Sequence, residues 1–107
     1  MQTGNLTFGE YLKNLIRQCK MTQTEFYTQL GITKPYFYDI LSGKTNALPP
    51  DKQIKACEIL QLKEKERQEF FDIAAKARNE IPADITQQID SNPKLIKKIR
   101  ELLVTAN

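Results

Sequence analysis

Helix starts recur along this sequence at intervals that leave little room for strands. Thr7 is followed three residues later by Glu10, and Thr22 by Glu25, which is the Thr-x-x-Glu pattern of a capping box. No segment alternates apolar and polar residues as a half-buried strand does, and no Asn-Gly or Asp-Gly pair indicates a hairpin. The sequence therefore predicts an all-α fold.

Glycines and capping residues divide the chain into its expected helices. Gly31 and Gly43 each follow an amphipathic segment, where glycine can adopt the left-handed conformation that ends a helix. Thr33 is placed to cap the next helix, which tolerates Pro35 in its first turn. The expected helices span residues 8–19, 23–30, 34–42, 51–61, 64–78, 83–89 and 93–104, the last of them capped by Ser91 or Asn92.

Helical spacing of apolar residues indicates which faces are buried. In the first expected helix these residues recur three or four positions apart, a pattern typical of an amphipathic helix. Cysteine inside such a pattern behaves as a small apolar residue, so we expect both thiols to be buried. The inward residues are expected to be Phe8, Tyr11, Leu12, Leu15, Ile16 and Cys19, then Ile54, Cys57 and Leu60, then Phe70, Ile73, Ala74 and Ala77.

Composition excludes several classes of function. The 107 residues include no histidine and only two serines, so histidine-based acid–base catalysis, Ser–His triads and zinc sites with imidazole ligands are absent. Nor is there a glycine-rich phosphate loop, a CxxC pair or another metal-ligand spacing. We expect no enzymatic activity, no metal and no cofactor.

No apolar segment approaches the roughly 20 residues needed to cross a bilayer, and residues 1–6 do not resemble a signal peptide. We therefore expect a cytoplasmic protein without a membrane partner.

Two of the expected helices, 23–30 and 34–42, are joined by only three residues, Gly31, Ile32 and Thr33. Two short helices joined by a tight glycine-containing turn form a helix-turn-helix. The apolar residues around this turn are spaced to pack into one small core: Phe26, Leu30, Ile32, Phe37 and Ile40.

Three spaced motifs carry a family resemblance: Met21-Thr22-Gln23-Thr24-Glu25-Phe26, Leu30-Gly31-Ile32 and Ile40-Leu41-Ser42-Gly43-Lys44. With them the chain resembles, over residues 8–62, the xenobiotic-response-element family of bacterial and phage helix-turn-helix regulators, which includes Cro and the lambdoid repressors. The resemblance implies a lambda-repressor-like, five-helix DNA-binding domain, placed at residues 1–79. Residues 80–107 resemble, less closely, a C-terminal helical extension of some members.

The helix 34–42 is the expected recognition helix. Phe37, Ile40 and Leu41 cluster on its inner side when residues are placed 100° apart. Its outer side then carries Pro35, Tyr38, Asp39 and Ser42, flanked by Lys34 and Tyr36. Ordinary amphipathic packing against a partner is the alternative explanation of this outer face.

In the major groove these residue types would read bases. Lys34 can donate to guanine O6 and N7, Asp39 can accept from cytosine N4, and apolar side chains can contact a thymine methyl. We assign base readout to Thr33, Lys34, Pro35, Tyr38 and Asp39. The resemblance implies phosphate-backbone contacts at Gln23 and just after the recognition helix, and we assign them to Gln23, Tyr36, Ser42, Lys44, Thr45 and Asn46.

The chain departs from the family pattern in two respects. Ile16 and Leu41 occupy positions where many members carry an Arg–Glu pair, and an apolar pair can brace the helices equally. The second departure is weak charge, because residues 1–50 carry a net charge of only +2. Fewer phosphate contacts predict weak binding by a single copy.

Apolar residues in the C-terminal region form two further stripes. The last expected helix carries Leu95, Ile96, Ile99, Leu102 and Leu103, and the preceding one carries Ile81, Ile85 and Ile89. Packing against the chain's own fifth helix and a dimer interface explain these stripes equally well. A twofold dimer would match a palindromic operator.

The preferred interpretation is therefore a sequence-specific regulator of transcription, a repressor that binds double-stranded DNA as a homodimer. One alternative is an interaction module, such as an antitoxin that neutralises a small protein partner through its C-terminal helices. Another is a helix-turn-helix that uses Tyr36 and Tyr38 as a protein-binding patch, since aromatic residues are enriched at interfaces.

Overall fold

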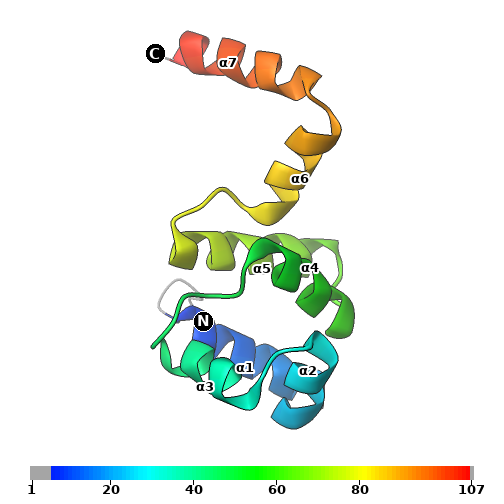
Figure 1. The fold of residues 1–107 in the computed structure, drawn as a ribbon. Helices are drawn as coiled ribbons and strands as arrows, with labels where there is room; N and C mark the ends of the chain where they lie inside the picture. The colour runs from blue at the N-terminus through cyan, green and yellow to red at the C-terminus, as the bar shows by residue number, and fades with distance from the viewer. Residues whose placement is uncertain (1–5, 107) are drawn as a thin grey trace.

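The computed structural model describes residues 6–106, and within this range it contains seven helices and no strand. The expected all-α fold is thus confirmed (Figure 1). The helices are α1 (Phe8–Gln18), α2 (Gln23–Leu30), α3 (Lys34–Ser42), α4 (Pro50–Ile59), α5 (Glu64–Arg78), α6 (Ala83–Ser91) and α7 (Lys94–Ala106).

The predicted N-caps of α1, α2 and α3 are present. In α1 the Glu10 amide donates to Thr7 Oγ1 at 3.1 Å and the Thr7 amide donates to Glu10 Oε1 at 3.0 Å. The same reciprocal pair opens α2. Gly31 and Gly43, both at φ +81°, end α2 and α3 in the left-handed conformation that favours glycine. The sequence therefore determines these boundaries locally.

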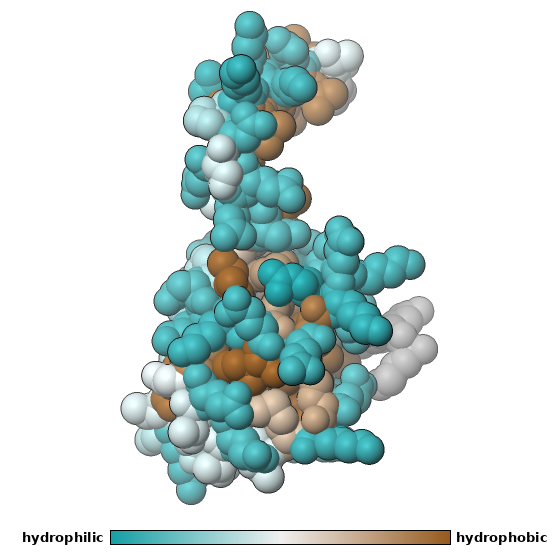
Figure 2. Space-filling model, turned by 90° about the vertical axis from the view of Figure 1, so that its right-hand side faces the viewer, coloured by the Kyte–Doolittle hydropathy of each residue, from teal (hydrophilic) through white to brown (hydrophobic). Residues whose placement is uncertain are grey.

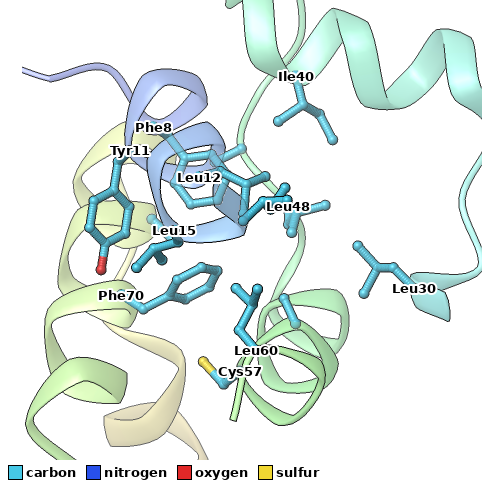
Figure 3. Close-up of a cluster of buried hydrophobic side chains, with 14 of the residues drawn as sticks. Phe8, Tyr11, Leu12, Leu15, Leu30, Ile40, Leu48, Cys57, Leu60 and Phe70 are labelled. Atoms are coloured by element: carbon cyan, nitrogen blue, oxygen red, sulfur yellow. The ribbon is translucent and has the colours of Figure 1, made fainter. Parts of the chain in front are cut away.

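The core forms where α1 meets the helices around it. α1 packs against α2, α3 and α5, while α4 packs against α2, α5 and α6. Leu12 of α1 is fully buried, with Phe8 and Leu48 beside it in Figure 3. The Phe8 ring meets the Phe70 ring edge-on, with 5.7 Å between the ring centroids. This core holds α2 and α3 on one side of the molecule.

α1 and α3 approach each other very closely at Gly9. A Cβ built on Gly9 would lie 2.8 Å from the Ile40 carbonyl oxygen and closer still to the Leu41 carbonyl. Real Cβ atoms essentially never come within 3.0 Å of another group, so only glycine allows this crossing. The backbone of the expected recognition helix is thus fixed against α1.

Two predictions about burial were wrong. Ala77 is exposed rather than inward, and Phe71 and Ala75 are buried instead, because α5 is covered by α6 as well as by α1 and α4. Cys19 is exposed, since it lies at the C-cap of α1, and its thiol donates to the Leu60 carbonyl at 3.4 Å. Cys57 is buried as expected.

The boundaries in the C-terminal region differ slightly from expectation. α6 continues to Ser91, two residues beyond the expected end, and α7 begins at Lys94. Asn92 lies between them, and its amide donates to the carbonyls of Gln88 and Ile89 at the end of α6. Asn92 therefore ends α6.

α7, which we call the arm, stands away from the rest of the chain. α6 packs on α4 and α5 and buries Ala83, whereas α7 packs on α6 and its apolar stripe does not cover α5 (Figure 1). The radius of gyration is 15.4 Å, against about 13 Å for a compact chain of this length. Packing against the fifth helix therefore does not explain the apolar stripe of α7, whereas α6, which carries Ile85 and Ile89, does pack on α5. We call helices α1–α6 the body.

Candidate nucleic-acid interface

The turn between α2 and α3 has the geometry of a helix-turn-helix. The Gly31 amide donates to the carbonyls of Tyr27 and Thr28, and the Ile32 amide donates to Tyr27. From α4, Lys52 donates through Nζ to the Leu30 carbonyl at 3.3 Å. An ammonium at this point stabilises the C-terminus of α2. Sequence patterns do not reveal this role, because the contact joins residues 22 positions apart.

The inner face of α3 is held by aromatic packing. Phe37 is fully buried, and its ring centroid lies 6.0 Å from that of Phe26 and 5.4 Å from that of Tyr27. Ile40, one turn later, is also buried. With this side fixed in the core, the opposite side of α3 faces outward at the end of the molecule remote from α7 (Figure 1).

The outer face carries most of the residues assigned to base readout. Thr33, Lys34 and Pro35 are exposed, and Tyr38 keeps 43% of its surface accessible. Lys34 Nζ lies 5.9 Å from the centroid of the Tyr38 ring, one helical turn along. The Lys34 ammonium and the Tyr38 ring thus form a continuous surface near the N-terminus of α3, with a charged part and an apolar part. Asp39 is half-buried at the edge of that surface.

Tyr36 is less available than the sequence indicated. Its side chain is half-buried and packs against the core, whereas Tyr38 is exposed. Helical geometry places Tyr36 beside the turn, where Ile32 also packs against the core. A surface with two fully exposed tyrosines is therefore not present.

The backbone after α3 is already hydrogen-bonded within the chain. The Asp39 carbonyl accepts from the Lys44 amide at 2.9 Å, from the Thr45 amide at 3.3 Å and from Ser42 Oγ at 3.2 Å. Lys44, Thr45 and Asn46 expose their side chains. Phosphate contacts at residues 44 and 45 would therefore come from side chains.

Gln23 is the first residue of α2 and is half-buried. Thr22 and Glu25 close the capping box beside it, and the hydrogen bond from the Thr22 amide lowers the pKa of the Glu25 carboxyl. First-turn amides without an intrahelical partner, such as those of Gln23 and Thr24, form a site suited to an anion. The N-terminus of α2 is thus chemically suited to phosphate.

Arg78, at the C-terminus of α5, holds the segment that follows α3. Its Nη1 donates to the Ala47 carbonyl at 2.8 Å, and its Nε forms an ion pair with Glu80 at 2.8 Å. Ala47 and Leu48 are buried. The segment that follows α3 is therefore tied to the body at residue 47, a link across 31 positions that the sequence did not indicate.

A glycine-ended α2, a tight turn and an α3 with an exposed polar face define the helix-turn-helix class of nucleic-acid-binding domains. The model of the family described as "Helix-turn-helix domain" matches residues 7–70, well over half of the chain. The chain belongs to this family, which lies in the superfamily of Cro-like regulators, and the assignment indicates a DNA-binding regulator. No curated protein and no solved structure matches the chain.

No helix between residues 6 and 106 is both long and apolar enough to cross a membrane. Within that same range no group of histidine, cysteine, aspartate and glutamate side chains is arranged to hold a metal ion.

Proposed function

We propose that the protein is a sequence-specific regulator of transcription that inserts α3 into the major groove of double-stranded DNA. The observation that carries the proposal is the outer face of α3, where Lys34 and Tyr38 are exposed while Phe37 and Ile40 fix the helix from behind. In this geometry the N-terminal residues of the helix approach base edges. In this function the chain has no catalytic role and needs no cofactor.

The contacts divide into two kinds. Lys34 reads guanine, Asp39 reads cytosine, and Thr33, Pro35 and Tyr38 contact neighbouring base edges. Gln23 and the side chains of the segment after α3 hold the phosphate backbone on either side, a role that fixes register without reading sequence. The side chains proposed to contact the phosphate backbone of the DNA are those of Gln23, Tyr36, Ser42, Lys44, Thr45 and Asn46.

Alanine variants separate the two kinds of contact. Lys34→Ala should cost about 1–3 kcal/mol on the preferred duplex and relax the preference at one position. Gln23→Ala should weaken all duplexes equally. Lys97→Ala removes the same charge from the arm and is the matched control. If Lys34→Ala behaved like Lys97→Ala in an anisotropy titration, α3 would not be the reading helix.

We also propose that two copies associate through their arms and bind a palindromic operator as a repressor. Leu102 and Leu103 keep 68% and 60% of their surfaces accessible, and hydrophobic atoms lie along one side of the upper part of Figure 2, which α6 and α7 form. Exposed apolar residues gathered on one helix face typically bind another protein. Dimerisation doubles the number of phosphate contacts, which compensates for the low net charge of residues 1–50.

Sedimentation equilibrium of the full chain tests this association. The wild type should show a monomer–dimer equilibrium, and Leu102→Asp with Leu103→Asp should shift it to monomer. The matched control is Lys97→Asp on the polar side of the same helix. A wild-type chain that stays monomeric at high concentration would contradict the dimer.

The exposed arm also supports a second candidate function, the binding of a small protein partner such as a toxin. Leu95 and Ile99 of α7 are half-buried, while Ile96 and Val104 remain open to another chain. A monomeric chain that copurifies with a partner, and loses it on Leu102→Asp, would favour this function over the homodimer.

The proposed location for either function is the cytoplasm. Repression would follow from competition with RNA polymerase at a promoter.

A further inference from the structure

A surface hollow of about 420 Å³ lies behind the segment that follows α3. In Figure 1 this segment passes between the start of α1 and the C-terminal part of α5. Phe8, Ile40, Ala47 and Ile73 supply an apolar lining, and Asn46 contributes a polar side chain. A site of this size and lining is in the range that small organic ligands occupy.

The charge that the described residues place around the hollow is of one sign, positive. Among the described residues that line it, Lys76 is the only charged one, and its side chain is exposed. Gly43 adds no side chain there, and a Cβ built on it would meet nothing within 4 Å. The space therefore suits a ligand with a compact apolar part and one negative group that pairs with the Lys76 ammonium.

The hollow shares its wall with the proposed DNA contacts. Thr45 and Asn46 line it and also belong to the set assigned to the phosphate backbone. Arg78 holds the next residue, Ala47, through its carbonyl, so the segment cannot move away freely. A ligand in the hollow must compete for the side chains of Thr45 and Asn46, and it adds negative charge beside the phosphate path.

We propose that this hollow is an effector site for a small aromatic or aliphatic carboxylate, and that its occupation weakens DNA binding. The regulatory part of this inference rests on the proposed function, whereas the binding part does not. By thermodynamic linkage, DNA should weaken the binding of the carboxylate by the same factor.

The binding part is tested with 1-naphthoate as the probe, titrated into the full chain without DNA and followed by amide NMR shifts. Saturable shifts should appear at residues 43–47 and 73–77. The uncharged analogue 1-naphthalenemethanol should bind about threefold or more weakly, because it lacks the charge that pairs with an exposed ammonium. Shifts confined to α6 and α7, or no saturation by about 10 mM, would overturn the site, since even weak specific ligands bind in the millimolar range.

Three variants locate the probe. Ala77→Phe fills the hollow from an exposed position and should abolish the shifts without disturbing the core. Lys76→Glu should weaken 1-naphthoate about tenfold while leaving the uncharged analogue unchanged. Lys97→Glu makes the same charge change on the arm and should leave both affinities unaltered. Equal effects of Lys76→Glu and Lys97→Glu would contradict the proposed ion pair.

The regulatory part is tested by measuring DNA affinity with and without saturating 1-naphthoate. The affinity of the wild type should fall about threefold or more, while that of Ala77→Phe should not respond. Probe binding with unchanged DNA affinity would overturn the regulation alone. A chain that binds 1-naphthoate but no DNA would overturn the proposed function and its regulation, and leave the ligand site standing.

Discussion

The body and the arm are built from the same kind of amphipathic helix, yet the apolar faces are buried in the body and exposed in the arm. Leu12 of α1 and Phe37 of α3 are fully buried, whereas Leu102 and Val104 of α7 keep 68% and 75% of their surfaces accessible. The sequence pattern defines an apolar face in both cases. It does not say whether the partner of that face lies within the same chain.

The two regions also lie at opposite ends of the molecule. α3 lies at one end, fixed by α1 and α2, and the arm lies at the other end beyond α6 (Figure 1). α7 also carries four basic residues and one acidic residue, so its polar side is the most positive helix surface of the chain. The body presents the helix-turn-helix, and the arm remains available to a second chain.

The largest contrast in the free energy of unfolding is expected when one leucine in each region is replaced by alanine. Leu12→Ala leaves a cavity in a closed core and should lower the free energy of unfolding by about 3 kcal/mol. Leu102→Ala should change it by less than about 0.5 kcal/mol in dilute protein, because the side chain is already exposed. Urea unfolding at several protein concentrations measures both. A large, concentration-independent loss in Leu102→Ala would mean that the arm packs on its own body.

The next effect tests how tightly the body is assembled at the recognition helix. Gly9→Ala should destabilise the chain by about 2 kcal/mol, because the new methyl group meets the backbone of α3. Helix propensity alone predicts the opposite sign, a gain of about 1 kcal/mol. Lys13→Ala, at an exposed position of the same helix, is the control and should have little effect. A stabilised Gly9→Ala variant would contradict the close crossing.

A smaller effect is expected at the caps, again with a counterpart on the arm. Thr22→Ala removes the acceptor for the Glu25 amide at 3.0 Å and should cost about 1 kcal/mol. Thr105 Oγ1 only donates to the Glu101 carbonyl within α7, so Thr105→Ala should be nearly neutral. Thermal unfolding of the two variants checks the contrast, and equal losses would argue against it.

The same cap gives a pH dependence of known sign. The pKa of Glu25 is lowered in the folded chain by its hydrogen bond from the Thr22 amide, so the stabilisation is present above the ordinary carboxyl pKa and disappears as the pH falls below it. Glu25→Gln should therefore flatten the loss of stability between about pH 5 and pH 3. An unchanged slope would mean that the carboxylate does not take part in the cap.

The smallest expected change is one of thiol reactivity rather than stability. Burial raises the pKa of Cys57 to about 11, so its thiol should resist alkylation at pH 8, while the exposed Cys19 should react. Leu102→Cys places a third thiol on the arm, and dimerisation should protect it as the protein concentration rises. Mass spectrometry of the alkylated chain distinguishes the three sites, and a Leu102→Cys thiol that reacts equally at all concentrations would count against the paired arms.

What the sequence predicted well is what short-range chemistry determines. The capping boxes at Thr7 and Thr22 and the glycines at residues 31 and 43 act within one helical turn, so the predicted ends of α2 and α3 were confirmed. Helical spacing likewise indicated the inner side of α3, with Phe37 and Ile40 buried.

What it missed depends on partners distant in the chain. Ala77 was expected inward because periodicity cannot reveal that α6 covers a different side of α5. The bonds from Lys52 to Leu30 and from Arg78 to Ala47 join separate helices or segments, and the close approach at Gly9 exists only once α1 and α3 are packed. The assigned roles of the site residues in DNA binding remain predictions.

Selection of bound duplexes from a random pool at about 0.15 M salt tests the central claim most directly, because long-range nonspecific attraction is largely screened there. The full chain should enrich a palindrome whose half-sites are separated by about one helical turn or a multiple of it. The variant with Leu102→Asp and Leu103→Asp should lose that pairing and bind single half-sites more weakly. A folded, helical full chain that enriches no sequence would contradict a reading role for α3.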